Sequence, residues 1–232
     1  MIKRLLLTVA AAVAISSFTS YAQRNDWANF GRFEQENKEL LASPTPSKRL
    51  VVFLGNSITE GWANMRPSFF TDNDFVGRGI SGQTSYQFLL RFRDDVINLH
   101  PRAVVINAGT NDVAENNHVY NEDRTFGNIV SMAELAKANN IKVILTTVLP
   151  AAGFGWNGSV KDAPEKIKSL NARIADYARE NKIPFVDYFT PLVSEDGKSL
   201  PARYSRDGVH PTEAGYEIME ATVLPVVRKI VK

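Results

Sequence analysis

The sequence lacks cysteine altogether and contains only 3 histidines among its 232 residues. The absence of cysteine excludes disulfides, thiolate metal ligands, a cysteine nucleophile and a lipid-modified N-terminal cysteine. Neither charge dominates, because 27 Lys and Arg face 25 Asp and Glu. Such a balanced surface has no bulk field that would attract nucleic acid. We therefore expect no nucleic-acid partner.

No apolar run is long enough to span a bilayer, which takes roughly 18–20 residues. The most apolar stretch covers residues 5–15, follows Lys3 and Arg4, and precedes the small-x-small sequence Ser20-Tyr21-Ala22. This pattern predicts a signal peptide at residues 1–22, and hence a periplasmic or secreted protein. The mature chain, residues 23–232, would carry 25 basic and 25 acidic residues.

The remaining length favours one large domain, since domains usually hold roughly 100–200 residues. Residues 26–41 have apolar side chains near helical spacing, and the sequence Ser43-Pro44-Thr45-Pro46-Ser47 then breaks the pattern. We expect a leading helix and linker at residues 23–49, followed by a single domain at residues 50–232.

Within that domain, short Val- and Ile-rich runs alternate with amphipathic stretches. The runs predict five buried strands, at residues 50–54, 75–76, 103–107, 141–148 and 183–187. The amphipathic stretches predict helices at residues 85–99, 125–139, 163–181 and 212–230. This α/β alternation predicts a parallel sheet covered by helices on both faces. Ligands bind such sheets at the carboxyl ends of the strands.

Polar residues follow the predicted strands in a consistent way. Ser57 follows the first strand, Gly82 the second and Asn111 the third, while Asp207 and His210 precede the last helix. Taken singly, each has an ordinary explanation. Ser57 with Glu60 matches a helix capping box, and the others are common turn residues. Their succession at one edge of the sheet favours a site instead.

These residue types are the ones that acyl transfer requires. A serine hydroxyl needs a base to take its proton, and histidine suits neutral pH. The imidazole needs an orienting carboxylate, and the tetrahedral intermediate needs fixed hydrogen-bond donors. We predict Ser57 as nucleophile, His210 as general base and Asp207 as its partner. The predicted oxyanion donors are the N–H groups of Ser57 and Gly82 and the amide of Asn111.

The sequence resembles the SGNH (GDSL-like) hydrolases from about residue 50 to the C-terminus. The resemblance rests on four blocks in order: Gly55-Asn56-Ser57, Gly82, Gly109-Thr110-Asn111-Asp112 and Asp207-x-x-His210. It implies a three-layer αβα, flavodoxin-like fold around the five-stranded parallel sheet, and ester hydrolysis without a cofactor. Asn56 replaces the Asp that gives the family its name, which resembles esterase branches more than lipases. The spacing is most similar to platelet-activating-factor-acetylhydrolase-like proteins and carbohydrate O-acetylesterases.

Two other motifs in the sequence do not predict a site. Residues 77–82 read G-x-G-x-x-G, but the next strand does not end in the acidic residue that a dinucleotide site requires. Asp112, Glu115 and His118 lie close in sequence, but the chain has only 3 histidines and no cysteine. His118 stands in the polar loop Glu115-Asn116-Asn117-His118, where we expect it to be solvated. We expect neither a cofactor nor a metal.

Aromatic residues near the predicted rim suggest substrate contacts. Trp62 follows the nucleophile, and Phe154 and Trp156 lie in a Gly-rich loop after the fourth strand. They would bind a sugar ring or an acyl group, or they would simply cover the core. Arg78 and Gln83 would bind substrate oxygens or serve only as surface residues.

The leading hypothesis is an exported serine esterase that removes acetyl groups from carbohydrates. A lysophospholipase or thioesterase is the alternative within the enzymes, and it would need a long apolar groove. A non-catalytic glycan-binding module is the alternative outside them. The sequence makes no prediction about oligomeric state.

Overall fold

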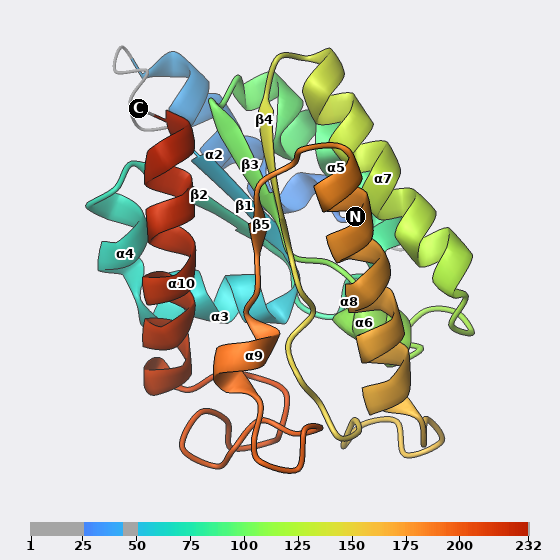
Figure 1. Ribbon diagram of the computed structural model, residues 1–232. Coiled ribbons are helices and arrows are strands. Elements are labelled where there is room, and N and C mark those ends of the chain that lie inside the picture. Colours follow the sequence, from blue (N-terminus) through green and yellow to red (C-terminus); the bar gives the residue numbers. More distant parts are fainter. Residues whose placement is uncertain (1–25, 44–50, 232) are drawn as a thin grey trace, which may run out of the picture.

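The computed structural model describes residues 26–43 and 51–231, so the predicted signal peptide lies outside the described residues. Its centre is a five-stranded sheet in which all neighbouring strands are parallel, in the order β2-β1-β3-β4-β5 (Figure 1). The strands are β1 (Val51–Gly55), β2 (Phe75–Gly79), β3 (Ala103–Ile106), β4 (Lys142–Thr146) and β5 (Phe185–Val186). This order is the flavodoxin-like one, which confirms the predicted fold class.

The sheet separates two hydrophobic layers because successive strand residues point to opposite faces. Val52 and Leu54 of β1 face one layer, and Val51 and Phe53 face the other. The helices of the first layer are α5 (Ser85–Asp95), α7 (Glu122–Ala138) and α8 (Ala163–Glu180). Those of the second layer are α3 (Ser57–Met65), α4 (Pro67–Thr71), α9 (Phe189–Leu192) and α10 (Glu213–Val231) (Figure 1). Among the described residues, no helix is both long and apolar enough to cross a membrane.

Strand β2 is longer than the sequence pattern predicted. It continues through Gly77 and Gly79, where the prediction stopped at Val76 because glycine weakens strands. Gly79 is required by a close approach, since a Cβ there would lie 2.2 Å from the backbone nitrogen of Glu60 in α3. The first half of the G-x-G-x-x-G sequence is therefore a strand. It cannot form the turn that binds a dinucleotide phosphate.

The leading segment, residues 26–42, packs against the outside of β2 and α5. It forms the short helix η1 (Phe30–Phe33) and α2 (Glu34–Ala42) instead of one continuous helix. The Asn37 amide oxygen accepts from Arg78 Nε at 3.0 Å and from Nη2 at 2.7 Å, and its Nδ2 donates to Asp95 at 2.9 Å. Phe33 lies 4.6 Å from the Arg78 guanidinium. Arg78 is thus buried under this segment, and the prediction of a surface or substrate-binding role for it was wrong.

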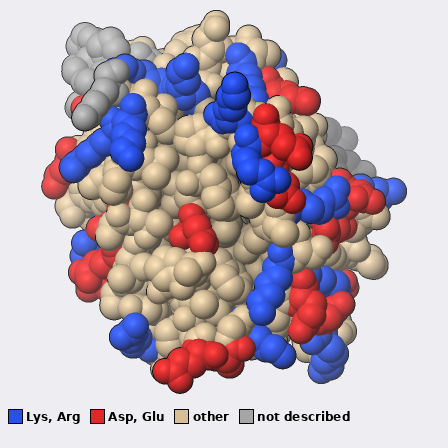
Figure 2. All heavy atoms as spheres, in the orientation of Figure 1, with Lys and Arg blue, Asp and Glu red and all other residues tan. Residues whose placement is uncertain are grey.

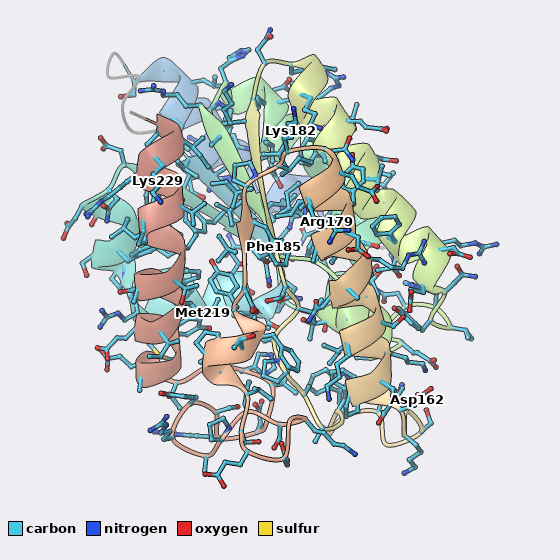
Figure 3. All side chains as sticks on the ribbon, viewed as in Figure 1. Asp162, Arg179, Lys182, Phe185, Met219 and Lys229 are labelled. Atoms are coloured by element: carbon cyan, nitrogen blue, oxygen red, sulfur yellow. The ribbon has the colours of Figure 1, made fainter. Side chains whose placement is uncertain are left out.

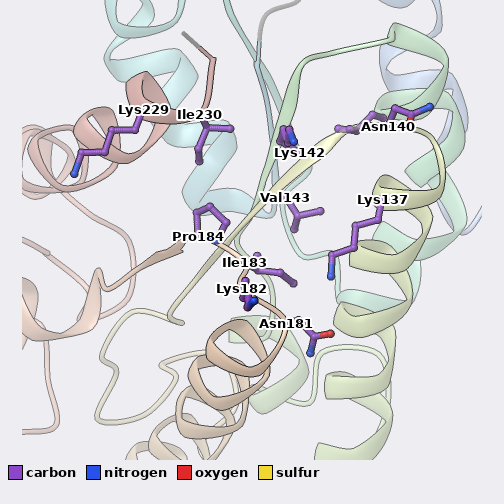
Figure 4. Close-up of a pocket in the computed structure, with 11 residues that line it drawn as sticks. Lys137, Asn140, Lys142, Val143, Asn181, Lys182, Ile183, Pro184, Lys229 and Ile230 are labelled. Carbon is purple, nitrogen blue, oxygen red and sulfur yellow. The ribbon is translucent and has the colours of Figure 1, made fainter.

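The two ends of the sheet differ in chemistry. Lys182 and Lys229 lie at the upper end in Figure 3, and Asp162, just before α8, lies at the lower end. Basic side chains gather over the upper half of the molecular surface seen in Figure 2. A hollow of about 650 Å³ opens there beside the amino ends of β4 and β5, with Lys137, Lys142, Lys182 and Lys229 around it (Figure 4). Lys137 and Lys229 stand in the last turns of α7 and α10, where a cation complements the helix dipole.

Candidate active site

Ser57 is the first residue of α3, at the carboxyl end of β1. Asn56 caps this helix, because its Oδ1 accepts the N–H of Ile58 at 2.9 Å. The capping box suggested for Ser57 and Glu60 is wrong. Glu60 instead accepts hydrogen bonds from the N–H, at 2.9 Å, and from the hydroxyl of Ser81. The Ser57 hydroxyl is therefore not needed for capping and is available for chemistry.

His210 is positioned by the loop that precedes α10. Asp207 Oδ1 accepts the backbone N–H groups of Val209 at 2.9 Å and of His210 at 2.8 Å. Ser205 Oγ donates to the same oxygen at 3.1 Å and accepts the N–H of Gly208 at 3.0 Å. One carboxylate oxygen thus fixes the turn, which leaves the other free to face the imidazole.

Ser57, His210 and Asp207 form one hydrogen-bonded line. The Ser57 Oγ lies 2.8 Å from His210 Nε2, and His210 Nδ1 lies 2.6 Å from Asp207 Oδ2. Because an ionised carboxylate only accepts, Nδ1 carries the hydrogen and Nε2 is left to accept from the serine hydroxyl. This is the arrangement in which an imidazole takes a serine proton and later returns it to a leaving group.

The Asp207 carboxyl is held in its charged form. Partial burial alone would raise its pKa, but the hydrogen bonds from the His210 ring and from the His210 and Val209 N–H groups lower the pKa well below its ordinary value. A carboxylate that stays ionised orients the imidazole and stabilises the imidazolium that forms during proton transfer.

Three hydrogen-bond donors belong to residues that line one hollow: the N–H groups of Ser57 and Gly82 and the Asn111 amide. The N–H groups of Ser57 and Gly82 donate to no other residue in the described part of the chain. Gly82 has φ +78°, a conformation that favours glycine and turns the loop after β2 toward Ser57. Asn111 donates through Nδ2 to the Gln83 carbonyl at 2.9 Å, which fixes the amide and leaves its second hydrogen available.

These groups line a hollow of about 360 Å³, which we call the reaction hollow. Its lining residues are Ser57, Ser81, Gly82, Asn111, Asn116, Trp156 and His210. Neither Asn116 nor Ser81 was predicted as a site residue. Asn116 lies in a polar loop without a recognisable motif, so only the three-dimensional structure places it here.

Asn116 joins the two sides of the reaction hollow. Its Nδ2 donates to the Gly82 carbonyl at 3.2 Å, and its Oδ1 accepts the Trp156 indole N–H at 2.8 Å. The Trp156 ring, 48% exposed, lies with its centroid 6.0 Å from that of His210. A single amide therefore connects the turn that carries a donor to the aromatic wall of the hollow.

The structure does not bring Trp62 to this site. Five residues after Ser57, it lies about 140° further around α3, at about 100° per residue. Its ring stacks on Phe69 and Tyr216, with centroids 4.9 and 5.7 Å away, and its Nε1 donates to Glu220 at 3.1 Å. It is 2% exposed. Trp62 is a core residue, and its predicted role in substrate binding was wrong.

Phe154 is also buried. It is 4% exposed and packs in the layer of α7 and α8, with its ring centroid 5.3 Å from that of Trp156. Of the two aromatic residues in the loop at residues 151–162, only Trp156 lines the reaction hollow. Phe154 packs against the Trp156 ring and is buried, so its predicted contact with substrate was wrong.

Asp112 serves the scaffold beside the site. Its buried carboxylate accepts the N–H of Ser85 at 3.0 Å, the Ser85 hydroxyl at 2.5 Å and the Thr125 hydroxyl at 3.3 Å. Burial raises its pKa despite these bonds. His118 lies 3.9 Å away, and the described residues contain no group of three or more side chains arranged to hold a metal. Asp112 thereby fastens α6 (Thr110–Val113), the short helix that also carries Asn111, to the start of α5 and to α7.

Arg91 joins the strand ends beneath the reaction hollow. Its buried guanidinium donates to the carbonyls of Gly55 at 2.9 Å and Arg78 at 3.0 Å, to Gln83 Oε1 at 2.6 Å, and to Asp95 at 2.8 Å. The prediction that Gln83 faces substrate or solvent was wrong, since it is buried between this cation and the protein backbone. The carboxyl ends of β1 and β2 and the turn after Gly82 are therefore held by one side chain.

The leading segment reaches the same turn. Gln83 Nε2 donates to the Ala28 carbonyl at 2.7 Å, and Gln87 Nε2 donates to the Trp27 carbonyl at 2.8 Å. Gln87 Oε1 in turn accepts the N–H of Thr84 at 3.0 Å. Residues 26–42 thus support the loop that presents the Gly82 N–H.

The chain is similar to a known protein family and to solved structures. The model of the GDSL-like Lipase/Acylhydrolase family matches residues 53–218. A GDSL-like lipase from Bacteroides thetaiotaomicron VPI-5482 is 63% identical, has a TM-score of 0.85, and aligns over 88% of this chain and 99% of its own.

Two more distant proteins are also similar. The lipoprotein YqeF of Bacillus subtilis is 28% identical over 63% of this chain and 73% of its own length. An acetylxylan esterase from Geobacillus stearothermophilus, solved as a catalytic mutant, is 21% identical with a TM-score of 0.61, over 80% of this chain and 96% of its own. At that identity the second likeness shows a shared fold.

Proposed function

Since this chain belongs to the GDSL-like lipase/acylhydrolase family and is a carboxylic ester hydrolase, we propose that it is an exported serine esterase that removes short acyl groups from carbohydrates. In the proposed reaction Ser57 Oγ attacks the ester carbonyl while His210 Nε2 takes its proton. The N–H groups of Ser57 and Gly82 and the Asn111 amide stabilise the oxyanion. His210 then protonates the leaving alcohol, and water hydrolyses the acyl-serine by the same steps in reverse.

The preference for a short acyl group is supported by the residues that line the reaction hollow. The hollow measures about 360 Å³, and Ser81, Asn111 and Asn116 contribute polar side chains to its lining beside the Trp156 ring. The part of a long acyl chain that stayed in water would gain none of the roughly 25 cal/mol per Å² that burial of apolar surface contributes. This disfavours the lysophospholipase or thioesterase alternative.

Carbohydrate as the alcohol is supported by two observations. A second hollow, larger in volume at about 670 Å³, borders His210, the residue that would protonate the leaving group. The structural relative from Geobacillus stearothermophilus is an acetylxylan esterase. The predicted signal peptide and the similarity to the lipoprotein YqeF support export. The hydrogen-bonded Ser57–His210–Asp207 line disfavours a non-catalytic glycan-binding module.

The test uses the purified chain from residue 23 onward. We expect a fluorophosphonate to label Ser57, and hydrolysis of 4-nitrophenyl esters to fall steeply from acetate to octanoate. Acetate should also be released from acetylated polysaccharides. Ser57→Ala is the matched control and should abolish all three signals. Activity that rises with acyl length, or labelling that persists in Ser57→Ala, would contradict the proposal.

A further inference from the structure

A second hollow adjoins the reaction hollow at His210, and we call it the α10 hollow. It measures about 670 Å³, within the roughly 300–1,000 Å³ that is usual for small-molecule sites. Its lining residues are Met65, Arg206, Asp207, His210, Pro211, Thr212, Glu213, Ala214 and Glu217. His210 borders both hollows. Ser57, Gly82 and Asn111 border the reaction hollow but not the α10 hollow.

The chemistry of the proposed reaction assigns the two hollows different parts of the substrate. The carbonyl oxygen must face Gly82 and Asn111, while the leaving oxygen must reach His210 Nε2 to receive its proton. The alcohol that leaves therefore extends past His210, where the α10 hollow begins. From this relationship, which rests on the proposed function, we infer that the α10 hollow is the subsite for the alcohol portion of the substrate.

The lining of the α10 hollow selects the class of alcohol. Glu213 and Glu217 are held by Arg66, whose Nη1 lies 3.0 and 3.3 Å from their carboxylates. Their side chains remain 65% and 57% exposed, so each keeps acceptor capacity toward a ligand. Arg66 is itself fixed by Glu220, through two hydrogen bonds of 3.0 Å from Nε and Nη2. The acceptors of this hollow are thus fixed before a ligand arrives.

Arg206 supplies the complementary donors. It is exposed, and it makes no ion pair or hydrogen bond within the described part of the chain. Met65, 49% exposed at the end of α3, adds an apolar surface. Sugar hydroxyls both donate and accept, and sugar rings have apolar faces, so these three features fit a neutral sugar chain. A uronate carboxylate would pair with Arg206, but it would also face the three carboxylates of Asp207, Glu213 and Glu217, and this excess of like charge disfavours a uronate-bearing chain.

The experiment compares two acetate esters that differ in the leaving alcohol. One is 4-nitrophenyl acetate, whose small leaving group makes few contacts in the α10 hollow. The other is a partially acetylated neutral xylo-oligosaccharide, followed by acetate release. We expect Arg206→Ala to lower kcat/KM for the oligosaccharide about tenfold more than for 4-nitrophenyl acetate, mainly through KM. This corresponds to one hydrogen bond to a charged group. Glu217→Gln should show the same selectivity with a smaller effect.

Arg203→Ala is the matched control. Arg203 lies three residues before Arg206, but its guanidinium lies over the Tyr204 ring at 4.3 Å, and it does not line the hollow. It should leave both activities within about twofold of wild type. An acetylated oligosaccharide of the same length that carries uronates should be hydrolysed less efficiently than the neutral one.

The outcomes separate the two proposals. If wild type releases acetate from the oligosaccharide and Arg206→Ala loses no more on it than on 4-nitrophenyl acetate, the subsite is overturned and the proposed function stands. If wild type hydrolyses 4-nitrophenyl acetate but neither oligosaccharide, carbohydrate specificity fails and the subsite with it. A preference for the uronate-bearing oligosaccharide would overturn the neutral class of ligand.

Discussion

Ser57 Oγ and His210 Nε2 lie 2.8 Å apart although 153 positions separate them in the chain. Ser57 begins the first helix after β1, and His210 lies three residues before the last helix begins at Glu213. Because β1 is an interior strand of the sheet and α10 packs in the same hydrophobic layer as α3, folding brings both residues to one edge. The two side chains should therefore act as a unit.

That unit can be tested by combining substitutions. We expect Ser57→Ala and His210→Ala each to reduce kcat for 4-nitrophenyl acetate by about 10⁴ or more. The double variant should be no slower than the slower single variant, because either change removes nucleophilic attack. Additive losses in steady-state kinetics would show that the two residues contribute independently.

Asp207 sets a second expectation, for the dependence on pH. The pKa of Asp207 is lower in the folded protein than in the unfolded chain, where it is about 3.9. Its contribution to the free energy of unfolding is therefore complete above about pH 3.9. That contribution is lost as the pH falls through the lower pKa of the folded state. Asp207→Asn should lower the unfolding midpoint at pH 7, and the difference from wild type should shrink below about pH 4. A difference that grows as the solution is acidified would have the wrong sign.

Asn111 tests the donors of the reaction hollow. Removing its amide by Asn111→Ala should cost roughly 10²–10³ in kcat with a small change in KM, because the donor acts mainly on the oxyanion. The same variant leaves the Gln83 carbonyl without its partner, so thermal unfolding must be measured alongside. A loss confined to KM would place the amide in ground-state binding instead.

Trp156 tests the limit on acyl length. Since its ring forms one wall of the reaction hollow, Trp156→Ala should widen that hollow and raise the ratio of kcat/KM for butyrate to that for acetate. Trp27→Ala is a useful control, because Trp27 is similarly exposed, at 49%, but lies in the leading segment. An unchanged ratio in Trp156→Ala would mean that other residues limit the acyl group.

Arg91 tests the scaffold. Arg91→Met removes a buried cation and leaves the Asp95 carboxylate and two strand-end carbonyls without that donor. Loss of one partner of a buried ion pair costs about 3–5 kcal/mol, which urea unfolding would measure. Arg93→Met, two residues along the same helix and exposed, should change stability by less than about 0.5 kcal/mol.

The sequence predicted the layers of this fold well, because buried parallel strands such as β1 and β3 are apolar on both faces. It also predicted which residues meet at the sheet edge, since Ser57, Gly82 and Asn111 each follow a strand. The sequence-based prediction was wrong where the direction in which a side chain leaves its helix decides whether it faces the site or the core. Trp62 is close to Ser57 in sequence but faces the opposite way, into the aromatic core.

Other features could not be read from the chain because they depend on contacts between distant segments. Asn116 acquires its place only when the loop after α6 (Thr110–Val113) meets Gly82 and Trp156. The burial of Arg78 depends on Asn37, 41 positions earlier. A polar residue in an irregular stretch gives neither the helical nor the strand periodicity from which structure is predicted.

The attachment of residues 26–42 through Gln83 and Gln87 has a practical consequence for handling this enzyme. Proteolytic removal of that stretch would deprive Arg78 of the Asn37 amide acceptor and expose the loop that carries Gly82 and Gln83, although Ser57, Asp207 and His210 would still be present. Catalytic turnover can thus serve as a gauge of whether the amino-terminal stretch is intact, and a nicked preparation should lose activity before its central sheet unfolds.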